Sequence, residues 1–283
     1  MVLEVFLNPL KIENKPGQII AYSLIYTILA ILLGLWIFSS EASMVMVFLS
    51  VMALLPFVYS LLKKEENKDL IAETEKALLK KHAKVLNIFM LLFLGMTLAF
   101  SLSYVFLPSQ ELGTTFDAQI SAINHNSGLA SGNLFEKTTF FKKVLFNNLR
   151  VMVLALLFSF IYGSGAIFIL AWNASVIGVA IGISIRNAIA EISSLVGLDL
   201  IAGYFNATVY GLTKYLIHGI PEILAYFAAG LAGGIISVSI VKHDFFSKKF
   251  NRILADSYSL IMISVLLIFL AALLEVWITP LLF

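Results

Sequence analysis

The chain has 283 residues, of which 60% are hydrophobic and 13% are charged, and its mean hydropathy is +0.96. Soluble domains carry about 25% charged residues, so this composition excludes a soluble protein and indicates an integral membrane protein. The net charge of +2 comes from lysines gathered in a few loops. Their distribution indicates membrane topology and gives no sign of a nucleic-acid partner. The absence of Cys excludes disulfides and thiolate metal sites.

The N-terminal part of the sequence predicts a surface helix and a transmembrane hairpin. Residues 1–18 alternate short apolar clusters with Pro-containing breaks, which is typical of a helix lying at the membrane surface. A bilayer core about 30 Å thick needs about 20 apolar residues per helix, and the blocks 19–38 and 43–62 have this length. No small-residue cleavage pattern follows the first block, so we expect no removable signal peptide. The charged residues 63–84 belong in water or among lipid headgroups.

The middle of the sequence predicts three further spans. The first covers residues 85–107. The uncharged run 151–185 is too long for one span, and we expect a break at Trp172-Asn173, because Asn tolerates turn geometry and Trp favours the membrane interface. This break gives one span at about 147–171 and another that starts at Ala174.

The C-terminal part predicts two more spans, at 221–241 and about 258–279. Residues 187–217 mix apolar and charged residues, as an interfacial or re-entrant connector does. The basic and aromatic loop 242–257 fits a helix that lies among headgroups. The predicted fold is therefore all-α, a polytopic membrane helical bundle of about seven transmembrane helices with a broken or re-entrant helix near 204–221.

The distribution of positive charge predicts the orientation of this bundle in the cell membrane. With seven spans, thirteen of the 19 Lys and Arg residues fall on the side of the N-terminus, and six fall on the side that includes the polar segment 108–146. Cytoplasmic loops are enriched in Lys and Arg. We therefore expect a cytoplasmic N-terminus and a C-terminus outside.

The stretch HGIPE places His218, Gly219, Pro221 and Glu222 inside an apolar and aromatic run. Pro suits the first turn of a helix, and a carboxylate there meets the positive end of the helix dipole, so the stretch is explained as a simple helix start. The alternative is a helix break buried in the bundle, where ionisable side chains are costly and mark a site.

Glu275 extends the second interpretation, because it lies about one turn before the end of an apolar run with no basic residue nearby in sequence. A side chain that reaches out to the membrane surface is the alternative. Together with His218, Glu222 and Asn173 it forms our candidate buried polar site. Asn147, Asn148 and Arg150 are supporting candidates, although capping and interface anchoring explain them as well.

Glycine-rich faces predict close helix packing. Gly178 and Gly182 form a GxxxG pattern, and a second small-residue face contains Gly230, Gly233 and Gly234. Both faces suit packing within the chain, and a homodimer interface is the sharper hypothesis.

Enzyme motifs are scarce. A glycine-flanked Ser164 with His218 gives a weak hint of an intramembrane serine hydrolase, and His218 with Glu222 supplies two ligands where catalytic zinc uses three. We expect no catalytic residues, no metal site and no cofactor.

Several stretches of the sequence resemble the stage II sporulation protein M family. They are FNNLRVMV (146–153), GSGAIFILAWNASVIG (163–178), HGIPEILAYFAAGLAGG (218–234) and ALLEVWITP (272–280). The resemblance covers about residues 85–283, which we treat as the membrane core, with residues 1–84 as an N-terminal addition. Ala174 stands where the family usually has glycine.

The resemblance implies a membrane scaffold or assembly factor for envelope-associated partners, since the sporulation member looks like a scaffold for cell-wall hydrolases. A channel or secondary transporter for an ion or small solute, using the buried His and Glu residues, is the alternative, and an intramembrane hydrolase is a distant third. The expected partners are the lipid bilayer, a second copy of the chain and other membrane or envelope proteins, with no nucleic acid.

Overall fold

The computed structural model describes residues 15–69, 75–126, 134–162, 165–191, 198–242 and 248–282. Most of the surface helix expected in residues 1–18 lies outside these ranges. Within them the chain is helical and no strand is present. The all-α prediction is therefore confirmed.

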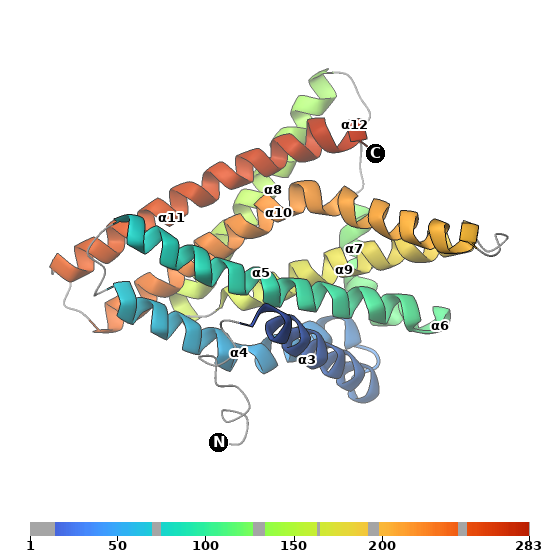
Figure 1. Cartoon of the computed structure of the whole chain (residues 1–283), viewed down its shortest axis with the longest axis horizontal. Coiled ribbons are helices and arrows are strands. Elements are labelled where there is room, and N and C mark those ends of the chain that lie inside the picture. Colours follow the sequence, from blue (N-terminus) through green and yellow to red (C-terminus); the bar gives the residue numbers. More distant parts are fainter. Residues whose placement is uncertain are drawn as a thin grey trace.

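The N-terminal half contains a hairpin, a long helix and two short helices (Figure 1). The hairpin consists of α3 (Pro16–Ile37) and α4 (Ala42–Asp69), and the long helix is α5 (Glu75–Phe106). Two short helices follow, α6 (Ser109–Thr115) and α7 (Asp117–Asn126). Although this last segment is polar, it packs back onto α4 and α9, with Phe116 and Gln119 fully buried.

The C-terminal half contains four long helices and a modified end. The long helices are α8 (Leu134–Tyr162), α9 (Ala166–Glu191), α10 (Leu198–Lys242) and α11 (Lys248–Leu273). A π-helical turn, η2 (Leu274–Ile278), continues α11 into α12 (Thr279–Leu282).

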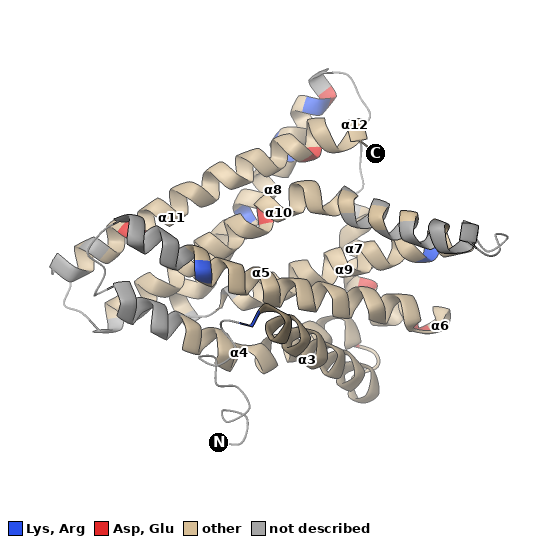
Figure 2. Ribbon diagram, in the orientation of Figure 1, with Lys and Arg blue, Asp and Glu red and all other residues tan. Residues whose placement is uncertain are grey.

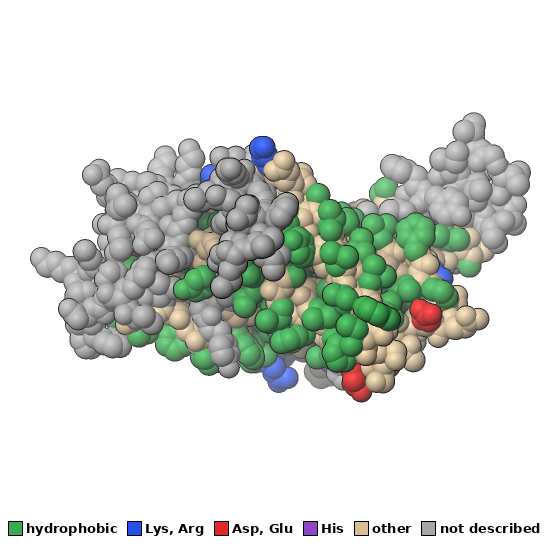
Figure 3. All heavy atoms as spheres, turned by 90° about the horizontal axis from the view of Figure 1, so that it is seen from below, with side chains coloured by type: hydrophobic (Ala, Val, Ile, Leu, Met, Phe, Trp, Pro, Cys, Tyr) green, Lys and Arg blue, Asp and Glu red, His purple; other side chains and the backbone are tan. Residues whose placement is uncertain are grey.

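Seven helices in the described ranges are long and apolar enough to cross a membrane, as predicted. Long middle stretches of α3 and α11 carry no charged side chain (Figure 2). A band of hydrophobic side chains crosses one face of the molecule, with acidic and basic side chains at its edges (Figure 3). Exposed apolar side chains of this kind, including Leu32, Phe48 and Leu266, suit contact with lipid tails.

Two packed groups of helices share the core. α5 packs between α3 and α9, while α10 packs against α8, α9 and α11. The ring of Phe227 on α10 lies 5.5 Å from that of Phe89 and 6.1 Å from that of Phe93, both on α5. These aromatic contacts join the two groups into one bundle.

Glycines bring the helix backbones together, as the sequence predicted. A Cβ atom at Gly178 would lie 2.7 Å from the Thr97 carbonyl oxygen, and one at Gly182 would lie 2.8 Å from the Tyr104 Cβ, so α9 needs glycine to approach α5. A Cβ at Gly233 would collide with the Leu156 carbonyl oxygen of α8. Packing within the chain is therefore confirmed for these three glycines. The homodimer interface stays a prediction.

The break expected at Trp172-Asn173 is wrong, because α9 runs through both residues without interruption. α8 instead ends at Tyr162, and α9 begins at Ala166. Here the Gly165 backbone lies so close to Phe158 that a Cβ atom would overlap its carbonyl oxygen. The tight approach that glycine permits outweighed the turn preference of Asn.

The broken or re-entrant helix near 204–221 is also wrong. α10 continues from Leu198 to Lys242 with Pro221 inside it. Proline is tolerated in membrane helices because neighbouring helices and local adjustments compensate for the missing backbone hydrogen bond. Pro221 therefore does not start a helix, and HGIPE lies in the interior of α10.

Candidate functional site

The candidate site lies where α8, α10 and α11 pack against one another. His218, Glu222 and Tyr226 follow one another at four-residue spacing on α10, so they share one face of that helix. Glu222 is seven residues inside the apolar span Tyr215–Ser237, which at 1.5 Å per residue is about 10 Å from its end. The carboxyl group of Glu222 is therefore attached well inside the apolar span, away from its nearer end.

The carboxyl group of Glu222 is held by a tyrosine one turn further along the helix. The Tyr226 hydroxyl donates a hydrogen bond to Glu222 Oε1 at 2.6 Å. Tyr226 is only 1% exposed, so its position is fixed by packing. A hydroxyl donor supports a carboxylate, but it carries no positive charge to balance it.

Glu275 approaches this face of α10 from the π-helical turn η2. Glu275 lies one turn before Thr279 and Glu222 lies one turn after His218, so the contact between Thr279 and His218 sets the two carboxyl groups at the same level of the bundle. Single π turns inside helices are rare and are frequent at functional sites. Here the wider turn carries an acidic residue toward another acidic residue.

Thr279 connects the same turn to His218. Its hydroxyl donates to the Leu274 carbonyl oxygen at 3.0 Å, and its Oγ1 lies 3.3 Å from His218 Nδ1. Since the single hydroxyl proton is already used, His218 Nδ1 acts as the donor to Oγ1. The contact ties the π turn to α10 one helical turn before Glu222.

The electrostatic character of the cluster is acidic. Within the part of the chain that the structure describes, neither Glu222 nor Glu275 has a Lys or Arg partner. Burying a charge without a partner is expensive. The arrangement therefore favours uptake of positive charge.

The supporting candidates on α8 divide into buried and exposed residues. Asn148 is 4% exposed, whereas Asn147 and Arg150 are exposed. The Asn147 Nδ2 donates to the Asn148 Oδ1 at 3.4 Å, and the Asn148 Nδ2 has no hydrogen-bond partner among the described residues. All three lie inside α8, so the expected helix-start capping role is wrong.

Asn173 does not join the cluster through any recorded hydrogen bond. Its amide donates to the Ile169 carbonyl oxygen within α9 at 2.8 Å. The structure therefore brings His218, Glu222 and Glu275 together and leaves Asn173 bonded to its own helix.

Sequence reasoning missed Tyr226 and Thr279. Both carry a signal in hindsight, because each lies four residues after a glutamate of the cluster, Glu222 and Glu275 respectively. The π turn has no comparable signal, since its residues continue an ordinary apolar run.

The described residues contain no group of three or more His, Asp or Glu side chains placed to hold a metal ion. Ser164, which the sequence suggested as a nucleophile with His218, lies outside the described residues.

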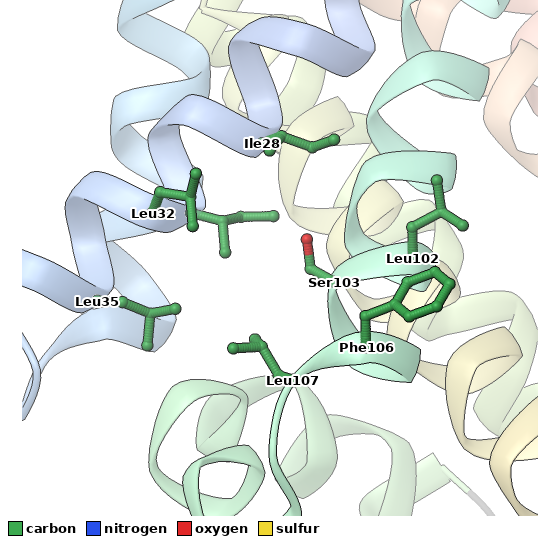
Figure 4. A pocket seen from close by; sticks show the side chains of 8 residues that line it. Ile28, Leu32, Leu35, Leu102, Ser103, Phe106 and Leu107 are labelled. Carbon is green, nitrogen blue, oxygen red and sulfur yellow. The ribbon is translucent and has the colours of Figure 1, made fainter.

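A second feature is an apolar groove of about 260 Å³ between α3 and α5. Side chains from the two helices face each other across it, and the Ser103 hydroxyl is its polar group (Figure 4). Leu32 and Phe106 at the groove are 55% and 79% exposed, so it opens to the lipid-facing surface.

Seven apolar helices in the described ranges, with a small polar cluster between α8, α10 and α11, define a multi-pass helical membrane protein. The family model described as stage II sporulation protein M matches residues 85–280, and the chain belongs to this family. The matched region contains the whole polar cluster, whereas α3 and α4 precede it. No curated protein and no solved structure matches the chain.

Proposed function

We propose that the protein is a membrane scaffold or assembly factor for envelope-associated partners. The observation that supports this function best is the apolar groove between α3 and α5, which opens to the lipid-facing surface. An apolar transmembrane helix of a partner suits such a lining, because close packing in the membrane depends on shape complementarity. The resemblance to the sporulation member of the family implies the same role, since that member looks like a scaffold for cell-wall hydrolases.

Site-specific photo-crosslinking in native membranes tests the scaffold function. A crosslinker at Phe106 is expected to capture one defined membrane protein, while a crosslinker at Leu266, which is 65% exposed on α11, captures lipid only. Ser103→Phe fills the groove and is expected to abolish the protein adduct, whereas Ser109→Phe outside the groove preserves it. Identical adducts from Phe106 and Leu266 would contradict the proposal.

A second candidate function is transport of an ion or small solute, and the polar cluster of α10 and η2 favours it. Glu222→Gln keeps the shape of the side chain and removes its charge, so flux through reconstituted liposomes is expected to fall while the fold persists. Glu111→Gln, at an exposed position on α6, is the matched control. Equal flux in both variants and the parent would remove this candidate.

We further infer that residues 1–84 form an addition to the core at 85–283, and that the N-terminus is cytoplasmic. Self-association also stays a proposal. A mass measurement in mild detergent tests it, and a strictly monomeric mass together with unchanged crosslinking in lipid would exclude a homodimer.

A further inference from the structure

The polar cluster has an unbalanced charge. Glu222 on α10 and Glu275 on η2 lie at the same level of the bundle, which the contact between His218 and Thr279 sets, and the hydrogen bond from Tyr226 supplies no positive charge. The other polar groups recorded beside them, His218 and Thr279, satisfy each other and the η2 backbone. Two ionised carboxylates in this low-dielectric position need a cation, since isolated buried charges are not stable.

Asn148 gives an independent sign that the cluster is incomplete. It lies on a buried stripe of α8 between two contacts that fix its level in the bundle. One turn before it, Val144 packs with Ala272 and Val276 of α11 and η2. Further along, Leu156 and Ser159 meet Gly233 of α10.

These contacts place Asn148 at the level of Glu222. α8 and α10 run in the same direction through the bundle (Figure 1), and residues 156–159 lie beside residue 233. At an equal rise per residue, position 148 of α8 falls within about one turn of position 222 of α10. The Asn148 side chain is 4% exposed and its Nδ2 has no partner among the described residues. Buried polar groups rarely stay unpaired, and this N–H group is a donor, so it suits a carboxylate oxygen of the cluster or a bound water.

We propose that Glu222 and Glu275 form a binding site for one monovalent cation, with Tyr226 and Asn148 as its polar neighbours. The shared chemistry is a single positive charge received by carboxylate oxygens. A proton needs only one carboxylate oxygen with a hydrogen-bonded neighbour, which Glu222 and Tyr226 supply. The site deepens the second candidate function, but binding here does not depend on transport.

The surroundings of the site are otherwise apolar or uncharged. α10 contributes the titratable His218 and Tyr226, and α8 contributes Asn148 while Arg150 is exposed. α9 packs beside Gly219 through Ile177 and carries the uncharged Asn173, and α5 presents phenylalanine rings to Phe227. A response to cations that needs both glutamates can therefore be assigned to this pair.

Thermal stability of the full chain in mild detergent tests the proposal, because a ligand that binds only the folded state raises its Tm. One arm varies Na⁺ against a bulky organic cation at fixed pH and ionic strength. The other lowers the pH without Na⁺. The parent protein is compared with the Glu222→Gln/Glu275→Gln double variant, whose uncharged pair keeps its shape, and with Glu111→Gln.

The expected result is a rise in Tm on acidification in the parent and in Glu111→Gln, which is lost in the double variant. A rise with Na⁺ that the double variant loses would also support the site and would identify a metal cation as its ligand. The proposal is overturned if Tm responds equally in the parent and the double variant, or if the parent responds to neither cation. Since no flux or partner is measured, these outcomes are independent of the scaffold and transport tests.

Discussion

At the scale of single residues, the main feature is a carboxyl group held inside a helix bundle by a tyrosine. Glu222 and Tyr226 are one turn apart on α10, and their hydrogen bond is 2.6 Å long. Because Tyr226 is fully buried, its hydroxyl cannot turn to bulk water instead. The pair should therefore respond to mutation as a unit.

Tyr226→Phe is expected to destabilise the protein by about 1–3 kcal/mol, because a buried acceptor loses its donor. Unfolding in mild detergent measures the change. Tyr258→Phe is the control, since Tyr258 is 64% exposed on α11 and its hydroxyl is replaceable at little cost. Equal stability of the two variants would show that the hydrogen bond to Glu222 contributes nothing.

At the scale of helices, the bundle depends on two local departures from a regular pattern. The π turn η2 brings Glu275 and Thr279 to face α10. Glycines on α9 and α10 let these helices approach their neighbours at backbone distance. Each departure makes a separate prediction.

Thr279→Val is expected to destabilise the folded state by about 0.5–1.5 kcal/mol, the net value of a typical hydrogen bond, because the Leu274 carbonyl and His218 Nδ1 both lose their partner. Thr279→Ser keeps the hydroxyl and is expected to stay closer to the parent in the same unfolding measurement. A larger loss in the serine variant would show that packing of the methyl group matters more than these hydrogen bonds.

Gly178→Ala is expected to cost about 1–3 kcal/mol, since the new methyl group forces α9 away from Phe100 and Thr97 of α5. Gly113→Ala on α6 is the control, because a Cβ atom there meets nothing within 4 Å. Thermal melting of both variants decides the matter. If Gly178→Ala melts at the same temperature as the parent, α5 and α9 are less tightly packed than the glycine geometry implies.

At the scale of the whole molecule, seven helices of the described residues are long and apolar enough to cross a membrane. The two ends of the bundle are distinguished by the loops that they carry. Helix α6 lies at the end that joins α5 to α7, and the start of α11 lies at the opposite end (Figure 1).

Cysteine labelling tests the orientation cleanly, because the natural chain has no Cys. We expect Glu111→Cys on α6 to react with a membrane-impermeant reagent applied to intact cells, and Asn251→Cys near the start of α11 to react only after the membrane is opened. This order follows from the excess of Lys and Arg on the side of the N-terminus. The reverse pattern of labelling would show that the predicted orientation in the membrane is wrong.

The sequence by itself determined the class of this protein. Apolar runs long enough to span the membrane must form helices, because lipid offers no hydrogen bonds to the backbone. This physical constraint made the all-α fold and the number of spans predictable, and the glycine patterns indicated close packing. The quoted motifs were also enough to identify the family that the comparison confirmed.

Tertiary structure decided where helices turn and which polar residues meet. Local preference placed a break at Trp172-Asn173 and a helix start at Pro221, yet α9 and α10 pass through both positions because packing supports them. Asn173 donates its hydrogen bond within its own helix, while the π turn brought Glu275 to the level of Glu222, 53 residues away in the numbering. Contacts between distant helices depend on the shapes of all the intervening side chains, and no short stretch of sequence records them.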